Sequence, residues 1–434
     1  MDKTEKRRNM EASSLTELYE QKKKQIIQDC DLCGICVDVC PTVPLTNLSS
    51  IPASDIQQKI IDVLKDGITS EEASLKSASC THCGICQNVC PVGINPVIMH
   101  ELLRLELVKL GKKAYPPMEI NVGDNTYFVP DIIASMQVKP NEKRWITKVP
   151  DNPPPKDIVV FTGCGMVMTP DKIFLVSSIL ERLGLDHTIV GGGELCCGVR
   201  YMGMNLDKAD AYGKALLHAL GAFKPKEVVF CCPGCAYQVA QYDQKIIPAH
   251  FHYEHLFHFL SQHVNELVFS QPINKTVTLH EPCSLSRALG DTTSLRTILK
   301  AIPGLQLIEM SSNKEQSICC GGAASRKLPI GSTMVKRCLE EAASTGAEVM
   351  VDACVGCHFQ FIPEESKYPF QIEHILTLIG EAMGINYEDK IKRFYRYGDI
   401  DRIMAEAREN IESSPYDSNS VAYLAKRMFV RSTT

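Results

Sequence analysis

Between residues 157 and 380 of this chain, short apolar runs alternate with longer segments of helical periodicity. The runs are rich in β-branched residues, as in buried strands, and the longer segments repeat apolar residues every third or fourth position. This pattern predicts strands at 158–162, 188–190, 228–230, 277–279, 305–309 and 349–351, and helices at 173–183, 209–220, 294–301 and 334–344. Such alternation predicts parallel sheets covered by helices. The order of elements repeats once, so we expect two duplicated α/β domains, at 157–270 and 271–380.

The first third of the chain lacks strand-like runs. Helical periodicity marks 14–28, 54–65, 71–78 and 96–110, whereas prolines interrupt 111–156, among them Pro116-Pro117, Pro130, Pro140 and Pro153-Pro154-Pro155. We therefore expect a lead-in helix within 1–29, a helical domain at 30–110 and a connector at 111–156. The predicted fold class is α+β multidomain, with a helical N-terminal domain followed by the duplicated α/β domains.

Two charged segments near the ends of the sequence have helical periodicity. The helix expected at 14–28 carries Leu15, Leu18, Tyr19 and Ile26 on one face. Packing on the next domain is the more frequent role of such a face, and membrane docking is the alternative. Residues 381–434 have helical periodicity at 401–411 and 420–429, and we expect a partner-docking cap rather than a catalytic element.

Composition and charge narrow the function classes. The chain has 434 residues, of which 44% are hydrophobic and 22% charged, as in ordinary globular proteins. The formal net charge of −5 gives no reason to expect a nucleic-acid partner. No apolar run reaches the length of about 18 residues that a membrane span needs, and no apolar core follows Met1–Met10 as in a secretory signal.

The chain contains twenty cysteines, which could form disulfides or bind metals. Disulfide scaffolds are mostly small, secreted and poor in core residues. This chain is large, and its cysteines cluster at the short spacings of metal sites. We therefore expect metal sites, a reducing compartment and, by default, the cytoplasm.

Eight cysteines form two copies of one run. Each copy has three cysteines separated by two residues and a fourth before proline: Cys30, Cys33, Cys36 and Cys40, then Cys80, Cys83, Cys86 and Cys90. This run is typical of two-cluster ferredoxins, in which the fourth cysteine binds the other cluster. We assign Cys30, Cys33, Cys36 and Cys90 to one cubane 4Fe-4S cluster, and Cys80, Cys83, Cys86 and Cys40 to the other. Two zinc sites, the alternative, do not explain the third and fourth cysteines or the prolines. With its helical insert, residues 30–110 are predicted to be a helical two-cluster ferredoxin domain.

Ten further cysteines form two sets of five in the α/β region. The sets are Cys164, Cys196, Cys197, Cys232 and Cys235, then Cys283, Cys319, Cys320, Cys354 and Cys357. Gly198 and Gly321 follow the cysteine pairs, and 31 and 33 residues separate the parts of the first set, against 35 and 32 in the second. Each set follows predicted strand ends, where open α/β sheets place their sites. Five soft thiolates favour iron and sulfide over magnesium or calcium.

The triplet Gly191-Gly192-Gly193 precedes the first cysteine pair and could indicate nucleotide binding. It lacks the spacing G-x-G-x-x-G of that motif. We favour the interpretation that these glycines let the backbone approach a bulky cluster.

With these motifs, residues 25 to 380 resemble the catalytic subunit of heterodisulfide reductase in its fused form, known as the D type. The resemblance implies that each five-cysteine set holds a noncubane 4Fe-4S cluster, so that the ten cysteines would be catalytic ligands. Cys231 aligns with Ala353 of the second set and is interpreted as a spare. Cys338 has no counterpart and is predicted to be a buried thiol.

The resemblance implies reduction of a mixed disulfide, that of coenzyme M and coenzyme B, or the reverse thiol oxidation. Cleaving a disulfide takes two electrons, whereas one cluster handles one at a time, so two intact sets suit this chemistry. His187, His280 and His358 lie near the motifs and could supply protons, with structural roles as the alternative. A non-catalytic electron relay, as in glycolate, lactate or glycerol-3-phosphate oxidising complexes or thiol:fumarate reductase, is the competing hypothesis. A zinc scaffold is the third.

No haem or flavin signature is present in the sequence. The expected partner is therefore a membrane cytochrome b or a flavin-bearing subunit that supplies electrons. We expect the protein in the cytoplasm or held at the cytoplasmic face of the membrane through that partner.

Overall fold

The computed structural model describes residues 12–112, 119–122, 125–323 and 328–430. The charged segment Met1–Met10 and the prolines Pro116-Pro117 lie outside the described residues. None of the helices in the described ranges combines the length and the apolar character that crossing a bilayer requires.

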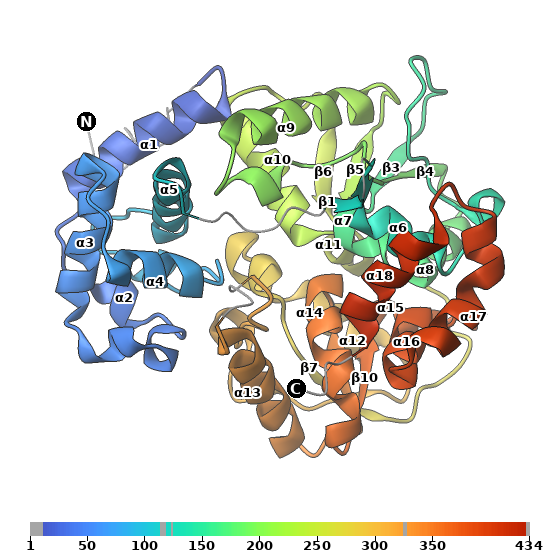
Figure 1. The fold of residues 1–434 in the computed structure, drawn as a ribbon. Coiled ribbons are helices and arrows are strands. Elements are labelled where there is room, and N and C mark those ends of the chain that lie inside the picture. Colours follow the sequence, from blue (N-terminus) through green and yellow to red (C-terminus); the bar gives the residue numbers. More distant parts are fainter. Residues whose placement is uncertain (1–11, 113–118, 123–124, 324–327, 431–434) are drawn as a thin grey trace.

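The N-terminal domain is helical, as predicted, and is coloured from blue to teal in Figure 1. Its main helices are α1 (Leu15–Asp29), α3 (Ala53–Asp66), α4 (Glu71–Ser79) and α5 (Pro96–Lys109), with a short turn α2 (Ile35–Asp38). Ser14, Ser70 and Asn95 cap α1, α4 and α5 by accepting hydrogen bonds from first-turn N–H groups. The predicted apolar face of α1 is buried, and α1 packs on α5 and on α9 (Leu206–Gly221) of the next domain. This confirms the packing interpretation of that face.

The α/β region contains two four-stranded parallel sheets. The first has the order β4-β3-β5-β6 and the second the order β8-β7-β9-β10. Their bounds are β3 (Ile158–Phe161), β4 (His187–Val190), β5 (Glu227–Phe230), β6 (His252–His255), β7 (Thr276–Leu279), β8 (Gln306–Leu307), β9 (Val349–Asp352) and β10 (Gln371–His374). The same strand order in both halves confirms the predicted duplicated α/β domains.

The sequence did not predict the last strand of either sheet. β6 and β10 are edge strands, and their sequences HYEH and QIEH carry polar residues because one side of an edge strand meets solvent. The helices that flank these strands were also missed: α10 (Pro233–Lys245), α11 (Leu256–Gln262), α14 (Val355–Phe361) and α15 (Ile375–Ala382). Each sheet is therefore one strand wider than predicted.

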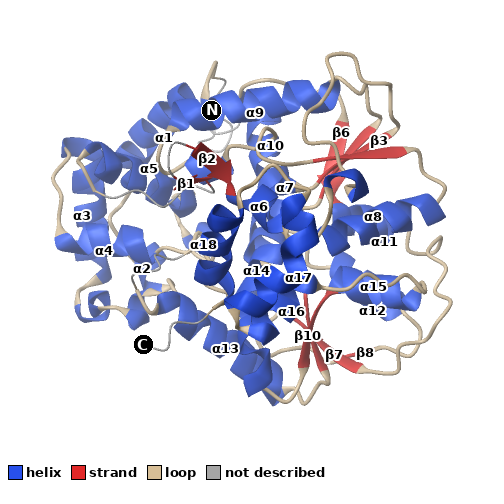
Figure 2. Cartoon of the chain, turned by 45° about the vertical axis from the view of Figure 1, so that its right-hand side comes forward, coloured by secondary structure: helices blue, strands red, loops and turns tan. Residues whose placement is uncertain are grey.

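The two halves pack through helices that lie between the two sheets (Figure 2). α8 (Pro170–Arg182) of the first half packs on α15 of the second, and α12 (Ser294–Ala301) of the second packs on α11 of the first. In chain order, α8 and α12 follow the first strand of their halves, β3 and β7. The helices α11 and α15 follow the fourth strand, β6 and β10. The same contact is thus made twice with the halves exchanged, as in an interface with two-fold symmetry.

The connector and the C-terminal extension cover these halves. The connector forms the hairpin β1 (Glu119–Val122) and β2 (Asn125–Phe128), followed by α6 (Val129–Ser135). The extension forms α16 (Lys390–Tyr397), α17 (Ile400–Glu412) and α18 (Ser418–Phe429), and α18 packs on α6. Phe394, Ile403 and Phe429 are buried on this chain itself. The apolar face of the extension is therefore occupied within the chain, and docking of a partner on its charged surface stays a prediction.

Asp389, the N-cap of α16, ties the extension to both halves through buried charges. Its Oδ2 atom lies 3.0 Å from Lys172 Nζ of the first half and 2.9 Å from His358 Nε2 of the second. Asp171 pairs with Lys172 at 2.5 Å and Asp352 with His358 Nδ1 at 2.7 Å. Because removing one partner of a buried ion pair leaves an unpaired charge, this network depends on every member.

We expect Asp389→Asn to lower the free energy of unfolding by about 2 to 4 kcal/mol, since it keeps the helix cap but removes the charge between Lys172 and His358. Asp399→Asn is the matched control, because Asp399 caps α17 in the same way but is exposed. The control should change stability by no more than about 0.5 kcal/mol. Anaerobic thermal or urea unfolding of the two variants measures the difference, and equal losses would contradict a special role for Asp389.

Candidate iron–sulfur sites

The first candidate site is a pocket at the edge of the helical domain. Four cysteines from the two runs line it: Cys30, Cys33, Cys36 and Cys90. Gln57 of α3 donates to Cys30 Sγ at 3.4 Å, and Cys36 Sγ donates to Gln57 Oε1 at 3.2 Å. Burial raises the pKa of Cys36 to about 12. The fourth cysteine of the second run thus joins the first three of the other run, in the crossed arrangement expected from the sequence.

The second candidate site joins the other four cysteines: Cys80, Cys83, Cys86 and Cys40. Burial raises the pKa of Cys86, which interacts electrostatically with the other three cysteines of this set. Cys80, Cys83 and Cys86 are buried, whereas Cys33 of the first site is exposed. The first site is therefore nearer to solvent than the second.

Lys76 of α4 lies beside the second site and is fully buried. Its Nζ atom is 3.4 Å from Cys40 Sγ and 3.4 Å from His100 Nε2. Burial opposes its charge, but Cys40, Cys80 and Cys86 raise its pKa, so the ammonium group is retained. Lys76 was not predictable from the sequence, because a lysine on a helix usually indicates a solvated face.

The backbone of the two runs has the same unusual conformation. Leu32 and His82, which precede Cys33 and Cys83, have φ of 57° and 54°. Outside glycine such values are uncommon and often accompany functional sites. A Cβ atom at Gly34, with φ of 77°, would come within 2.5 Å of the backbone carbon of Ala53. The glycine of the first run is therefore required by the tight turn that brings its cysteines together.

The five cysteines of the first α/β half lie together at the carboxyl ends of its strands. Cys164 follows β3, Cys196 and Cys197 follow β4, and Cys232 and Cys235 follow β5. Burial raises the pKa of Cys164 to about 11, and this thiol interacts with Cys232 and Cys197. Hydrogen bonds from the neighbouring thiols of Cys196 and Cys235 lower the pKa of Cys197.

The second half repeats this arrangement. Its cysteines Cys283, Cys319, Cys320, Cys354 and Cys357 follow β7, β8 and β9. Cys283 Sγ and Cys319 Sγ are 3.9 Å apart, and Cys320 Sγ and Cys357 Sγ are 3.3 Å apart. A thiol hydrogen bond from Cys357 lowers the pKa of Cys354. Both sets predicted from the sequence are thus brought together.

The glycine after each cysteine pair has a local structural cause. Gly198 and Gly321 have φ of 81° and 75°, and their N–H groups donate to Cys196 Sγ at 3.3 Å and to Cys319 Sγ at 3.4 Å. A Cβ atom at Gly198 would come within 2.3 Å of the carbonyl oxygen of Ala209. Glycine therefore orients the first sulfur of each pair while the next helix packs directly on the turn.

The two five-cysteine sites lie next to each other. The helix after the last cysteine pair of each half packs on the turn after the first cysteine of the other: α10 on Ser284–Ala288, and α14 on α7 (Gly163–Val167). At one of these contacts a Cβ atom on Gly165 would be 3.6 Å from Cβ of Val355. Gly165 adjoins Cys164, and Val355 adjoins Cys354, so cysteine loops of the two halves face each other.

The cysteine spacing fits a group larger than a single ion. Four cysteines around one zinc ion at about 2.3 Å would hold their sulfurs about 3.8 Å apart. Among the described residues, no three cysteine sulfurs come within 4.8 Å of one another. In addition, His280 Nε2 is buried without a hydrogen-bond partner in the described structure, close to Cys319. Open thiolate sets and an unpaired donor or acceptor beside sulfur suit an iron–sulfur cluster better than the zinc alternative.

Comparison with known proteins agrees with this geometry. The family described as Cysteine-rich domain (CCG) matches residues 158–240 and 277–362, and the family described as 4Fe-4S double cluster binding domain matches residues 5–93. The chain is an iron–sulfur protein with two CCG domains.

Curated relatives of this CCG protein are distant. It is 29% identical to the D subunit of Dihydromethanophenazine:CoB--CoM heterodisulfide reductase from Methanosarcina barkeri, over 71% of this chain and 78% of the relative. The B subunit of fumarate reductase (CoM/CoB) from Methanothermobacter marburgensis is 26% identical over 55% of this chain and 49% of its own length. Lactate utilization protein A 1 of Bacillus mycoides is 24% identical over 52% of this chain and 96% of its own length.

The glycine triplet of the first CCG domain lies against side chains of the chain itself. A Cβ atom on Gly191 would overlap Thr162 Oγ1, and one on Gly193 would be 2.8 Å from Phe128 Cβ of the connector. The Gly193 N–H group donates to Asp131 Oδ2 at 2.9 Å. The glycines thus allow close approach of the protein's own side chains, and the expected approach to a cluster stays a prediction. The Asp131 carboxylate occupies the Gly193 N–H group, so that this group is not available to bind a phosphate.

The three candidate histidines have different surroundings in the CCG domains. His187 is the first residue of β4, at the strand end opposite the cysteines, and its Nδ1 atom lies 3.0 Å from the Leu185 carbonyl oxygen. Both ring nitrogens of His358 bond to carboxylates, those of Asp352 and Asp389, which gives it a structural role. Burial lowers the pKa of His280 to about 4, and only this ring adjoins the cysteines with a nitrogen left unpaired in the described structure.

The two cysteines outside the sets are buried. Cys338 Sγ lies 3.5 Å from the Ile318 carbonyl oxygen and is 1% exposed, which confirms the buried-thiol prediction. Cys231 is also buried, and burial raises its pKa.

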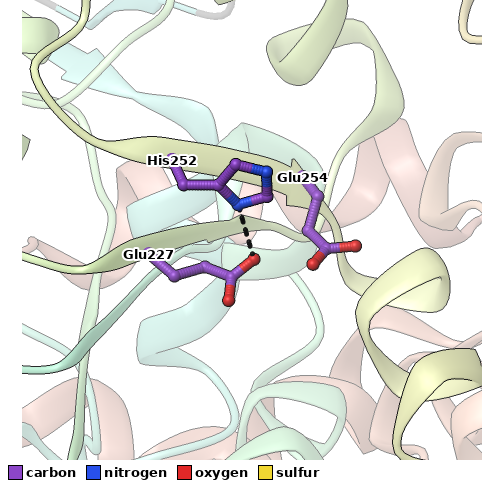
Figure 3. A group of neighbouring side chains, drawn as sticks. All are labelled: Glu227, His252 and Glu254. Atoms are coloured by element: carbon purple, nitrogen blue, oxygen red, sulfur yellow. Dashed lines mark hydrogen bonds and ion pairs between the residues drawn. The ribbon is translucent and has the colours of Figure 1, made fainter.

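Figure 3 shows a separate polar group on the edge of the first sheet, formed by Glu227, His252 and Glu254. Glu227 and His252 are paired across the first residues of β5 and β6, far along the strands from the cysteines. His252 Nδ1 is 3.2 Å from Glu227 Oε1. Burial, and then the Glu227 carboxylate, raise the pKa of Glu254 to about 8. This group was not predicted from the sequence because two of its members lie on strand β6, which the sequence did not predict.

Lys76→Met should shift the reduction potential of a cluster at the Cys40, Cys80, Cys83 and Cys86 site to more negative values, by on the order of 50 mV. A buried cation favours the reduced cluster because that form carries one more negative charge. Lys65→Met, at an exposed position of α3, is the control. The reduction potentials of both variants are measured by redox titration, with electron paramagnetic resonance (EPR) reporting the reduced cluster. An unchanged or more positive potential in Lys76→Met would contradict this electrostatic role.

Glu254→Gln should stabilise the protein at pH 8 relative to wild type, by on the order of 1 kcal/mol, and the difference should vanish near pH 5. The pKa of Glu254 is higher in the folded than in the unfolded protein. The protonated carboxyl group therefore contributes its full stability below the unfolded pKa, and this contribution is lost as pH rises through about 8. Denaturation at the two pH values measures the difference. Glu266→Gln, an exposed control, should show no such pH dependence. A pH-independent effect of Glu254→Gln would refute the assignment.

Proposed function

We propose that this protein is the catalytic subunit of an oxidoreductase that reduces a small-molecule disulfide to two thiols. By similarity to the D subunit of heterodisulfide reductase, the disulfide would be that of coenzyme M and coenzyme B. The reaction is RSSR′ + 2e⁻ + 2H⁺ → RSH + R′SH. The observation that carries the proposal is that both five-cysteine sets are complete and their loops lie against each other.

The proposed cofactors are two cubane and two noncubane 4Fe-4S clusters. The cubane clusters would be held by Cys30, Cys33, Cys36 and Cys90, and by Cys80, Cys83, Cys86 and Cys40. The noncubane clusters would be held by Cys164, Cys196, Cys197, Cys232 and Cys235, and by Cys283, Cys319, Cys320, Cys354 and Cys357. When bound, such clusters supply electrons one at a time and can bind sulfur at iron.

The protein itself would orient the cysteine sulfurs and hold the two five-cysteine sites next to each other. Gly198 and Gly321 orient the first sulfur of each cysteine pair, and the contact of Gly165 with Val355 keeps the two loops adjacent. The two sulfur atoms of a disulfide substrate would thus meet different sites of one enzyme, and neither would leave as a radical. His280 Nε2 is the proposed hydrogen-bonding partner of sulfur in the second site.

The proposed electron donor docks on the double cluster domain. Cys33 is exposed there, and the neighbouring Ile35 is an exposed apolar residue. Since the chain has no haem or flavin motif, the donor would be a membrane cytochrome b or a flavin-bearing subunit. We place the protein in the cytoplasm, or at the cytoplasmic face of the membrane through that partner.

A second candidate function is an electron relay without a substrate site. The similarity to the B subunit of fumarate reductase (CoM/CoB) and to lactate utilization protein A 1 supports it. A relay needs a continuous chain of clusters but not two complete, adjacent five-cysteine sites.

Cys232→Ala and Cys354→Ala should each abolish reduction of the coenzyme M–coenzyme B disulfide with a reduced viologen, by about 100-fold or more, because each removes a ligand from one half. Cys231→Ala is the matched control, since the equivalent residue of the second half is already Ala353. Wild type should contain about sixteen irons per chain, as four 4Fe-4S clusters require.

Two results would contradict the catalytic proposal. The first is full disulfide reduction by a variant that has lost the iron of one half. The second is wild-type protein, purified without oxygen, that contains only about eight to twelve irons and transfers electrons to a quinone, which would favour the relay.

A further inference from the structure

The double cluster domain is attached mainly to the first CCG domain. α1 packs on α9, where the Leu15 N–H group donates to Asp210 Oδ1 at 3.1 Å and Thr16 Oγ1 donates to Asp207 Oδ1 at 2.8 Å. The apolar core of the helical domain is continuous with that of the first CCG domain and includes Cys197 and Cys235. Judged only by the packing between domains, electrons would be expected to pass from the double cluster domain into the first CCG domain.

The cysteine loop of the second cubane site instead faces the second CCG domain. Cys83 lies in one small buried group with Cys319, Ile330 and Met334. Burial, and then the electrostatic effect of Cys319, raise the pKa of Cys83 to about 11. Cys319 is the first cysteine of the pair in the second CCG domain. A proposed cubane ligand and a proposed noncubane ligand are thus neighbours across the domain boundary.

Arg287 bridges the same boundary and is almost completely buried. Its Nε atom donates to the carbonyl oxygen of Cys83 at 2.5 Å, and Nη1 donates to those of Glu315 and Ser317 at 2.8 Å each. Ser317 is two residues before Cys319. One guanidinium group therefore fixes the carbonyl of a cubane ligand relative to the loop that leads to Cys319.

Arg287 also lies close in sequence to the five-cysteine site of the second CCG domain. It lies in the turn Ser284–Ala288, four residues after Cys283, and its Cβ atom would be 3.6 Å from a Cβ atom on Gly84 of the cubane loop. The residue four positions after Cys164 in the first half is Met168, which carries no charge. The carbonyl oxygen of Met168 accepts a hydrogen bond from Gln137 of the connector at 2.8 Å. The duplicated halves are therefore unlike at this position, and only the second has the arginine.

We infer that electrons pass from the double cluster domain into the second CCG domain at the contact of Cys83 with Cys319, and that Arg287 is the positioning residue of this transfer. In each transfer the cubane site is oxidised by one electron and the second CCG site is reduced by one, with no bond or proton change. The first CCG site receives its electron through the second half. This inference deepens the proposed function, but it concerns the electron path and does not need the disulfide.

The test uses the complete, cluster-loaded protein, sodium dithionite as reductant and no disulfide. Rapid freeze-quenching and EPR follow the signals of the cubane and CCG sites with time. Arg287→Met should slow the appearance of the second CCG signal by about 10- to 100-fold, as loss of a residue that orients a metal site does. Arg287→Lys should restore part of the rate, because a lysine can still donate to the Cys83 carbonyl oxygen.

Arg200→Met is the matched control, since Arg200 lies beside Cys164 of the first half. It should leave the transfer from the cubane site to the second CCG site at the wild-type rate. A wild-type rate in Arg287→Met, or equal slowing in Arg200→Met, would overturn the inference.

A second pair of variants decides the path if Arg287→Met fails to load its clusters. Cys232→Ala, which removes a ligand of the first half, should keep fast reduction of the second CCG site. Cys354→Ala should leave the electrons in the double cluster domain. Reduction of the first CCG site at the wild-type rate in Cys354→Ala would overturn the inference. If the wild-type protein transfers electrons normally between these sites but does not reduce the disulfide, that result would count against the proposed function alone.

Discussion

Ten cysteine sulfurs must gather at the carboxyl ends of parallel strands, and most of the fold serves this requirement. In each sheet the first cysteine follows a central strand, and the pairs follow its two neighbours. Parallel strands make this possible because all their carboxyl ends lie at one edge of the sheet. A glycine in the left-handed region, Gly198 or Gly321, then lets each cysteine pair turn tightly under the next helix. The other elements hold these two edges against each other.

The halves are held by a contact that duplication makes self-complementary. Helices that follow the first and fourth strands of each half pack on their counterparts, and the cysteine loops meet beside them. The pseudo-two-fold relation gives both sites the same surroundings to a first approximation. Single residues then break the equivalence, above all Arg287 in place of Met168. Such differences allow duplicated sites to take successive rather than identical roles in electron transfer.

Three of the chain's charged side chains lie largely buried where separate parts of the chain meet. Lys76 lies among thiols of the helical domain, Arg287 lies between that domain and the second half, and Asp389 joins the extension to both halves. Burying an ion is costly unless partners surround it, so each of these charges fixes the relative position of the groups that bind it. Thiolates and clusters carry negative charge, which explains why two of the three are cations.

The helical double cluster domain, the duplicated α/β domains and the grouping of cysteines into sets could all be predicted from the amino-acid sequence. These features rest on local periodicity and on motif spacing, and the crossed ferredoxin sets were predictable because the run has a known geometry. The edge strands β6 and β10 were not predictable, since their polar residues follow from exposure at a sheet edge. The close neighbours of the glycine triplet, Thr162 and Phe128, were not predictable because they come from distant segments. The buried Lys76, Arg287 and Asp389 and the contact of Cys83 with Cys319 became visible only in three dimensions. Their partners lie far away in sequence, and a charged residue has no pattern that tells whether packing will bury it.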